Sequence, residues 1–426
     1  MNEQIKQRIE QIRRGEVPEG YKKTKVGIVP EEWEEHKLSH YLTVNNDKNT
    51  DLKYTKDDVF SISGELGIVN QIELLGRSYA SVSVAPYGIV YPNDVVYTKS
   101  PLKANPYGII KTNKLGVTGI VSTLYAIFHC NNNVSPDYVQ LYFESDHNLN
   151  NYLYPIVNIG AKHDMKISDE GSLRGTVVFP PLPEQEKIAE ILQTQDKVIE
   201  LQQKKIDELK RLKKVYLSKM FPKKGCNVPK IRFPGFTDPW EQRKLGELAL
   251  FNPKDELPQT FEYVDLESVV GTEMLSHRTE VKSSAPSRAQ RLAHTGDLFY
   301  QTVRPYQKNN YLFEKPDNNY VFSTGYAQMR PYVDGYFLLS LVQSERFVKV
   351  VLDNCTGTSY PAINANDLAE IEVAAPSDES EAQKIGTIFR SIDNLITLHQ
   401  RKCEEQKKYK KALMQILLTG IVRVTL

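Results

Sequence analysis

Two long segments of the chain carry apolar side chains at the spacing of an α-helix. In residues 184–221 they recur every three, four or seven positions, until Pro222 and Gly225 end the pattern. Residues 380–418 show a second stripe of matching length. Each pattern predicts one long helix, and the match indicates that the two helices pack on each other. Packing of each helix on its own domain is the alternative.

Outside these helices, the pattern predicts strands, turns and short helices. Residues 93–97 and 296–300 each predict a turn that leads into a buried strand, and the apolar run 117–128 predicts a further buried strand. Residues 136–143 and 336–344 fit short helices. The fold class expected from this mixture is α/β mixed (α+β).

The N-terminal segment has its own amphipathic pattern. Ile5, Ile9 and Ile12 recur at helical spacing before Gly15. This pattern predicts a short helical arm, for which a frayed surface helix and a docking element fit equally well.

The chain also repeats itself, with a period of about 200 residues. Trp33 and Trp240 open equivalent blocks, and each copy closes with a strand, a proline and one of the long helices. Residues 45–90 and 252–292, by contrast, do not align. The helices match in order at Asp196, Ile199, Leu201, Gln203, Lys205, Glu208, Lys210, Lys213 and Lys214, against Asp393, Ile396, Leu398, Gln400, Lys402, Glu405, Lys407, Lys410 and Lys411. The two copies therefore share a common framework of elements but differ in the segments between them.

Length and charge narrow the possible functions. With 426 residues, the chain is long enough for two domains. Its 54 Lys and Arg against 53 Asp and Glu leave a net charge of +1, whereas a free-standing DNA-binding protein is usually far more basic. Contact with DNA would therefore need locally clustered basic residues or partners that supply phosphate contacts.

Other compositional features exclude several classes of protein. The four cysteines form no Cys-x-x-Cys pair, which argues against a zinc site or a disulfide framework. The chain has no apolar run long enough for a membrane span and no signal-peptide pattern, so we expect a cytoplasmic protein without membrane contact.

Motifs for catalysis are missing from the sequence. There is no phosphate-binding Gly-x-x-x-x-Gly-Lys-Ser/Thr loop and no Gly-x-Gly-x-x-Gly fingerprint. Asn252-Pro253-Lys254-Asp255 starts like an adenine-methyltransferase motif but lacks the second proline and the aromatic ring, so we interpret it as a turn. We expect no catalytic residues, no metal site and no cofactor in this chain; a self-sufficient enzyme is the rival hypothesis.

One segment resembles a known family. The run Pro181-Leu182-Pro183-Glu184-Gln185-Glu186-Lys187-Ile188-Ala189 is similar to the start of the central helical region in the specificity (S) subunits of type I restriction-modification systems. The second copy is degraded, with Ala375-Pro376 and Gln383-Lys384-Ile385-Gly386 remaining. The blocks from Trp33 to Leu38 and from Trp240 to Leu245 also match, so the resemblance covers nearly the whole chain.

The resemblance implies a specific architecture. Two similar target-recognition domains are separated by two long antiparallel helices that form a coiled-coil spacer, with a pseudo-twofold internal repeat. The expected parts are an N-terminal helical arm (1–20), recognition domain 1 (21–183), the central helix (184–224), recognition domain 2 (225–379) and the C-terminal helix (380–426).

The resemblance also implies a function. Each recognition domain would read one half of a bipartite site in double-stranded DNA, and the helices would set the spacing and dock two methylation (M) subunits. A helix of about 37 residues spans about 55 Å, or about 16 base pairs. Restriction (R) subunits would join the complex, and S-adenosylmethionine, ATP and Mg would be bound by the partners. The alternatives are a coiled-coil interaction scaffold and an orphan DNA-binding protein without cognate partners.

Candidate DNA contacts lie in basic, turn-rich loops, because phosphates attract Lys and Arg while base edges are read by Arg, Lys, Asn, Gln and Ser. Two equivalent loops follow the 93–97 and 296–300 strands, a second equivalent pair follows Gly160 and Gly357, and one basic stretch is specific to the second domain. The candidates are Lys99, Lys103, Asn105, Tyr107, Lys162, His163, Lys282, Arg288, Arg291, Arg304, Tyr306, Lys308, Asn309, Ser359 and Tyr360.

Overall fold

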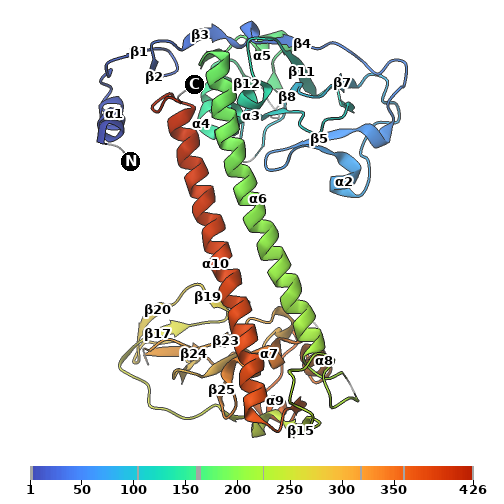
Figure 1. Cartoon of the computed structure of the whole chain (residues 1–426), viewed down its shortest axis with the longest axis vertical. Coiled ribbons are helices and arrows are strands. Elements are labelled where there is room, and N and C mark those ends of the chain that lie inside the picture. The colour runs from blue at the N-terminus through green and yellow to red at the C-terminus, as the bar shows by residue number, and fades with distance from the viewer. Residues whose placement is uncertain are drawn as a thin grey trace. The chain divides into compact units, whose positions relative to one another are not determined.

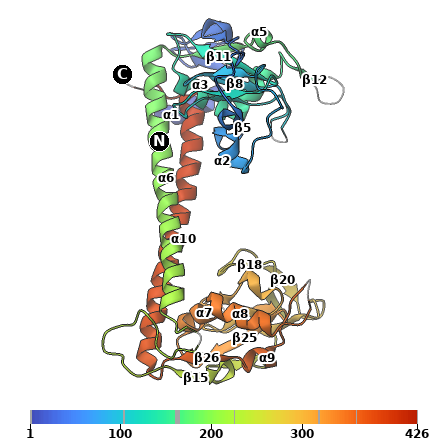
Figure 2. The same cartoon turned by 90° about the vertical axis from the view of Figure 1, so that its right-hand side faces the viewer.

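A computed structural model describes residues 3–102, 105–159, 165–223, 225–316, 319–357 and 360–424. The chain divides into two compact units, one formed by residues 1–200 with 404–426 and the other by residues 201–403. Helices α6 (Leu182–Lys219) and α10 (Glu379–Leu417) each contribute to both units and lie side by side (Figures 1 and 2). The division differs from the predicted domain boundaries because it cuts through both helices, and those boundaries stay a prediction.

The first unit is a mixed α/β body. Its main sheet has the strand order β4-β11-β8-β9, and β3 pairs antiparallel with β14. Its helices are α1 (Glu3–Arg13), α2 (Gln71–Leu75), α3 (Pro136–Glu144), α4 (Asp146–Leu153) and α5 (Asp169–Ser172). Its strands are β1 (Tyr21–Lys23), β2 (Ile28–Pro30), β3 (Glu34–Lys37), β4 (Leu42–Val44), β5 (Phe60–Ser63), β6 (Gly67–Asn70), β7 (Gly88–Val90), β8 (Val95–Thr98), β9 (Ile110–Thr112), β10 (Gly119–Val121), β11 (Tyr125–Cys130), β12 (Asn158–Ile159), β13 (Met165–Lys166) and β14 (Thr176–Phe179).

The second unit has the same frame. Its sheet β16-β25-β22-β23 corresponds to the main sheet of the first unit, and β15 pairs with β26 as β3 does with β14. Its helices are α7 (Gly335–Gln343), α8 (Glu345–Asp353) and α9 (Ala365–Ala369). Its strands are β15 (Glu241–Lys244), β16 (Ala249–Phe251), β17 (Thr260–Val264), β18 (Val269–Val270), β19 (Glu273–Met274), β20 (Arg278–Val281), β21 (Ala289–Leu292), β22 (Leu298–Gln301), β23 (Tyr311–Leu312), β24 (Tyr320–Ser323), β25 (Tyr326–Pro331) and β26 (Glu372–Ala375).

The units differ in what is inserted into this frame. The first contains the separate hairpin β5-β6 and the pair β7-β10, whereas the second contains a four-stranded sheet, β20-β17-β24-β21. Most of the inserted strands lie in the segments that did not align in the sequence, whereas β10 and β24 lie outside them. The predicted fold class, a mixed α/β repeat with two long antiparallel helices, is confirmed.

The prediction of one continuous strand over residues 117–128 was wrong. The segment forms two strands, β10 and β11, separated by a turn in which the Tyr125 amide donates to the Ser122 carbonyl. Val117 and Leu124 are exposed, because the first lies before β10 and the second lies in the turn. An apolar run alone does not reveal such a break.

The two long helices pack both on their own unit and on each other, so both alternatives hold in different parts. Near the start of α6, Ile188 and Leu192 belong to the core of the first unit. Near the start of α10, Ile385 and Phe389 belong to the core of the second. The remaining turns supply the contacts between the helices.

In the first unit these contacts are polar. The Gln195 Nε2 atom lies 2.6 Å from Gln406 Oε1, and Lys410 Nζ lies 2.7 Å from Asp196 Oδ1. Since Ile188 and Leu192 share a core with Leu417, and Gln195 meets Gln406, the helices run antiparallel.

In the second unit, Leu209 packs against Ile392 and Ile396, at positions equivalent to the polar Gln406–Gln195 pair. Lys213 Nζ lies 2.7 Å from Asp393 Oδ1, which repeats the Lys410–Asp196 pair. The helix pairing therefore follows the sequence repeat, and Lys213, a polar interruption of the apolar stripe, makes a direct contact between helices.

A buried carboxylate fastens each long helix to its unit. In the first unit Glu184, which is 1% exposed, accepts hydrogen bonds from Trp33 Nε1 at 3.2 Å and from Arg423 Nε at 2.6 Å. The Trp block, the start of α6 and the segment after α10 thus meet at one carboxylate.

The second unit repeats this arrangement. Glu381, which is fully buried, accepts from Trp240 Nε1 at 3.2 Å and from Arg232 Nε at 2.7 Å. The repeated Trp–Glu–Arg contacts explain why the only two tryptophans of the chain occupy equivalent places.

Candidate nucleic-acid interface

A buried aspartate anchors the turn before the central strand of each unit. In the first unit, Asp94 accepts from the Tyr91 amide at 2.9 Å and contacts His129 Nδ1 at 2.7 Å. Burial raises the pKa of the Asp94 carboxyl, which the hydrogen bonds from Tyr91 and His129 partly offset. In the second unit, Asp297 makes the equivalent contacts with the His294 amide and with Arg330. Each anchor fixes the strand, β8 or β22, whose far end leads into a candidate DNA-contacting loop.

In the first unit, the candidate residues of this loop contact their own unit. Lys99 Nζ forms an ion pair with Asp169 at 2.7 Å, and Asn105 Nδ2 donates to Asp146 at 3.0 Å. Tyr107 packs against the core. Lys103, Lys162 and His163 lie outside the described residues. All six stay predicted DNA contacts, and the three described ones would have to exchange or extend these contacts to reach DNA.

The equivalent loop of the second unit presents more of its side chains to solvent. Arg304 and Lys308 flank the short 3-10 helix η5 (Pro305–Gln307), and both have left-handed backbone, with φ of 55° and 56°. Tyr306 is exposed, while Lys308 pairs with Glu345 at 2.8 Å. The left-handed backbone is costly for residues with a side chain and is concentrated at functional loops.

The structure brings this loop together with the second candidate loop. The Arg304 amide donates to the Pro361 carbonyl at 2.8 Å, and the Ile363 amide donates to Thr302 at 3.1 Å. The Arg304 guanidinium carbon lies 4.4 Å from the ring centroid of Tyr360, which is 63% exposed. Ser359 lies outside the described residues.

Backbone hydrogen bonds extend this edge toward the basic stretch of the second unit. The Thr302 amide donates to Gly325, and the adjacent Thr324 amide donates to the carbonyl of Arg288. Arg288 is exposed, and so is Lys282, whose Nζ atom donates to a carbonyl at 3.2 Å. The structure therefore connects Arg288 to the Arg304–Tyr360 edge.

Two other candidates, Arg291 and Asn309, are half-buried. Burial lowers the pKa of Arg291, whose Nε atom has no hydrogen-bond partner among the described residues. The Asn309 side chain accepts from the Gly271 amide at 2.8 Å. Both stay predicted DNA contacts.

One exposed basic residue of the first unit, Arg77, was not among the predicted DNA contacts. The Arg77 guanidinium carbon lies 4.6 Å from the ring centroid of Tyr79, which is 59% exposed. Both residues follow α2, in the segment 45–90 that has no counterpart in the second unit. Without an aligned partner, these two residues lacked the signal on which most of the other candidates were chosen.

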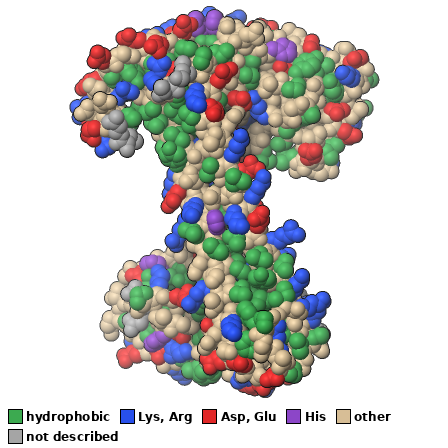
Figure 3. All heavy atoms as spheres, in the orientation of Figure 1, with side chains coloured by type: hydrophobic (Ala, Val, Ile, Leu, Met, Phe, Trp, Pro, Cys, Tyr) green, Lys and Arg blue, Asp and Glu red, His purple; other side chains and the backbone are tan. Residues whose placement is uncertain are grey.

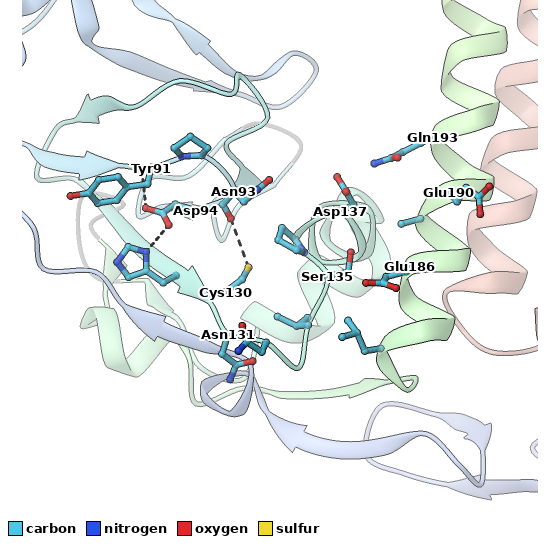
Figure 4. Close-up of a pocket in the computed structure, with 17 residues that line it drawn as sticks. Tyr91, Asn93, Asp94, Cys130, Asn131, Ser135, Asp137, Glu186, Glu190 and Gln193 are labelled. Carbon is cyan, nitrogen blue, oxygen red and sulfur yellow. Dashed lines mark hydrogen bonds and ion pairs between the residues drawn. The ribbon is translucent and has the colours of Figure 1, made fainter. Parts of the chain in front are cut away.

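The first unit contains a groove of about 920 Å³ between the main sheet and α6 (Figure 4). Asp137, Glu186 and Glu190 line it, and Cys130 lies at its floor. Burial raises the pKa of the Cys130 thiol to about 12, so the thiol stays protonated and is a poor nucleophile. Among the residues that the structure describes, no group of three or more His, Cys, Asp or Glu could hold a metal ion.

Basic and acidic side chains are interspersed on the face shown in Figure 3. In the described part of the chain, no helix is both long and apolar enough to span a bilayer. On the face shown in Figure 3, basic groups therefore occur singly or in small sets.

The fold is that of an internally duplicated protein, in which one frame carries two different sets of surface loops. No protein-family model matches the chain. Two curated relatives from Methanocaldococcus jannaschii do match. The type I restriction enzyme MjaVIII specificity subunit is 27% identical over 58% of this chain and 62% of its own length. The MjaX protein, named as a type I restriction enzyme specificity subunit, is 23% identical over 95% of this chain and 97% of its own length.

Solved structures agree with these matches. A chain from a structure on complex assembly and conformational transition of the type I restriction-modification system has a TM-score of 0.54 at 16% identity, covering 92% of this chain and 99% of that one. The type I system S subunit from M. genitalium has a TM-score of 0.52 at 14% identity, covering 92% and 97%. The resemblance inferred from the residues is therefore confirmed: the chain has the fold of the type I specificity subunits and is similar to them over nearly its full length.

Proposed function

We propose that this chain is the DNA-specificity subunit of a type I restriction-modification complex, in which each unit reads one half of a bipartite site in double-stranded DNA. The observation that carries the proposal is the repeat itself, because the frame of the two units agrees while the inserted loops differ. Different loops on one frame are what the reading of two unlike half-sites requires. The full-length similarity to proteins named specificity subunits supports this function.

The helices offer equivalent surfaces for partner subunits. Leu201 of α6 and Leu398 of α10 match in the sequence repeat, and they are 64% and 45% exposed. We take this matched pair of exposed leucines as candidate contacts with another protein. A duplicated surface supports docking of two copies of one partner, for which we propose two methylation subunits, with restriction subunits joining the complex.

In this proposal the chain itself is not catalytic. S-adenosylmethionine, ATP and Mg are bound by the partner subunits, and the complex acts in the cytoplasm. Both relatives are named specificity subunits, which supports the assignment of catalysis to the partner subunits. The purified chain, mixed with DNA and S-adenosylmethionine, is expected to transfer no methyl group; turnover by the chain alone would favour the self-sufficient enzyme.

An exchange of residues 230–376 for the corresponding segment of a divergent relative tests the proposal. Because the exchanged segment contains the inserted sheet of the second unit and leaves α6 and α10 in place, only one half of the recognised site should change. Methylated positions in genomic DNA would report both halves. An unchanged site would instead favour a coiled-coil scaffold without a DNA role.

A further inference from the structure

Each unit presents one arginine stacked on an exposed tyrosine, and this shared feature is not part of the repeated frame. Arg77 lies over Tyr79 in the first unit, and Arg304 lies over Tyr360 in the second. The first pair follows α2 in the 45–90 segment, whereas the second joins the loops around η5 and residue 360. The two pairs therefore arise from unrelated loops.

The surroundings of these two arginines also differ from those of other stacked arginines. Neither forms an ion pair with a carboxylate among the residues that the structure describes. In contrast, Arg278, which stacks on the buried Tyr263, is neutralised by Asp265 at 2.7 Å and by Glu280 at 2.8 Å.

Arg390, which stacks on Tyr336, pairs with Glu314. The stacked guanidinium groups of Arg278 and Arg390 are thus also held in internal ion pairs. At Arg77 and Arg304, the guanidinium N–H groups keep their capacity to donate to another molecule.

Hydrogen bonds with glutamine side chains brace the loops that carry both stacks. The Tyr79 amide donates to the Gln71 side chain at 2.6 Å, and Gln71 Nε2 donates in turn to Ser61 at 3.1 Å. In the second unit, Gln301 Nε2 donates to Gln307 Oε1 at 2.8 Å, beneath the loop that carries Arg304. A guanidinium held by a ring and a braced loop loses less conformational freedom on binding than a free one.

We propose that Arg77 and Arg304 are the specificity-determining arginines of the first and second units, and that each reads a guanine through its O6 and N7 atoms in the major groove. This inference rests on the proposed function. A planar guanidinium with free N–H groups matches the paired acceptors of guanine, and this is the commonest base-specific contact of arginine. The tyrosine ring fixes the plane of the guanidinium and thereby its angle to the base.

The test uses the complex that the full-length chain forms with its modification subunits in cells. Wild-type, Arg77→Gln and Arg304→Gln complexes would each select duplexes from a randomised pool, followed by sequencing. We expect Arg77→Gln to relax a G·C preference in one half of the site only, and Arg304→Gln to relax one in the other half only. Affinity for the wild-type site should fall about 5- to 150-fold in each case. Arg174→Gln, at an exposed position just before β14, should change neither half.

The tyrosines provide a second measurement that does not depend on losing the charge. Tyr360→Phe keeps the ring and should keep the selected sequence, whereas Tyr360→Ala should broaden the same position that Arg304→Gln affects. Tyr79→Phe and Tyr79→Ala should behave in the same way in the other half.

Other results would overturn the inference. A uniform loss of affinity for all sequences, with the salt dependence reduced by about one phosphate contact, would make these arginines backbone contacts. An unchanged selection would leave them without a reading role. A wild-type complex that selects no bipartite sequence would instead contradict the proposed function, so the two failures are distinguishable.

Discussion

At the residue scale, the buried carboxylate of Glu381 is the point at which the second unit holds its long helix. The carboxylate receives hydrogen bonds from Trp240 and Arg232, and no part of its side chain reaches solvent. A buried charge is tolerable when its partners are present and costly when one is removed, since desolvation is then uncompensated. The contact therefore contributes more to the placement of the helix than to net stability.

Replacement of Arg232 by alanine should accordingly destabilise the second unit. We expect the free energy of unfolding to fall by about 3–5 kcal/mol, as for other buried pairs that lose one partner. Urea unfolding followed by tryptophan fluorescence would measure it. Arg243→Ala removes a more exposed pair with Glu247 and should cost less than about 1 kcal/mol. Equal losses in the two variants would contradict this account of Glu381.

The ion pair between Asp393 and Lys213 predicts a pH dependence. Burial raises the pKa of Asp393 above its usual 3.8, and the nearby Lys213 opposes the rise. The native carboxyl thus keeps its proton at pH values where the unfolded chain has released it. The contribution of Asp393 to stability is therefore largest below pH 3.8 and falls as the pH rises through the raised native pKa.

Asp393→Asn, which cannot ionise, should flatten this part of the stability profile. Urea unfolding at a series of pH values from about 3 to 6 would show the difference from wild type. Asp207→Asn, at an exposed position of α6, serves as the matched control and should leave the slope unchanged. A profile of Asp393→Asn that parallels wild type would count against the raised pKa.

At the element scale, the helix pair uses different chemistry at equivalent positions. Gln195 and Gln406 bond to each other in the first unit, where the second unit has Ile392 packed against Leu209. A buried polar pair adds little net stability, but one member left alone costs the desolvation of its amide. Replacement of the polar pair by the apolar pair should therefore be tolerated only when both residues are changed together.

The double variant Gln195→Ile with Gln406→Leu should be as stable as wild type or more stable. Gln406→Leu alone should lose about 1–3 kcal/mol, because the buried Gln195 amide then keeps only a long contact of 3.5 Å with the backbone carbonyl of residue 406. A double-mutant cycle by urea unfolding, followed by circular dichroism, would measure the coupling. Additive losses from the two single variants would show that the amides do not act as a pair.

The elements themselves were largely predictable, and the physical reason is periodicity. The stripes of α6 and α10 and the buried strands β8 and β22 all follow from local spacing, which sequence displays directly. The contact between Glu184 and Arg423 could not be predicted in this way, because the two residues lie 239 positions apart along the chain. The turn between β10 and β11 was hidden by an apolar residue, Leu124, that the fold leaves exposed.

For most of the candidate DNA contacts, the repeat supplied the comparison on which the prediction was based. Arg304 and Tyr360 were chosen because their loops occur at equivalent places in both copies, and the structure places them in contact. Arg77 and Tyr79 lie in a segment without a counterpart, so no pattern distinguished them from other surface residues. Contacts such as Lys99–Asp169 depend on tertiary pairing, which spacing does not encode.

At the scale of the whole molecule, the charge balance limits what the chain can do alone. Its net charge is +1, and candidate cations such as Lys99 and Lys308 are already paired with carboxylates. Affinity for DNA comes largely from the release of counterions when cations neutralise phosphates. A chain whose cations are matched by nearly as many carboxylates gains little from that release. Under the proposed function, we therefore expect the base-reading side chains to act mainly once another protein holds the duplex in place.

The isolated chain should therefore bind DNA weakly, with a Kd of about 10⁻⁶ M or higher at physiological salt, as in non-specific binding. Addition of the methylation subunits should tighten binding and steepen its dependence on salt, because the partners would supply most of the phosphate contacts. Fluorescence anisotropy with a labelled duplex at several salt concentrations would measure both effects. Nanomolar, sequence-specific binding by the free chain would mean that its own loops contact the backbone far more extensively than the paired lysines suggest.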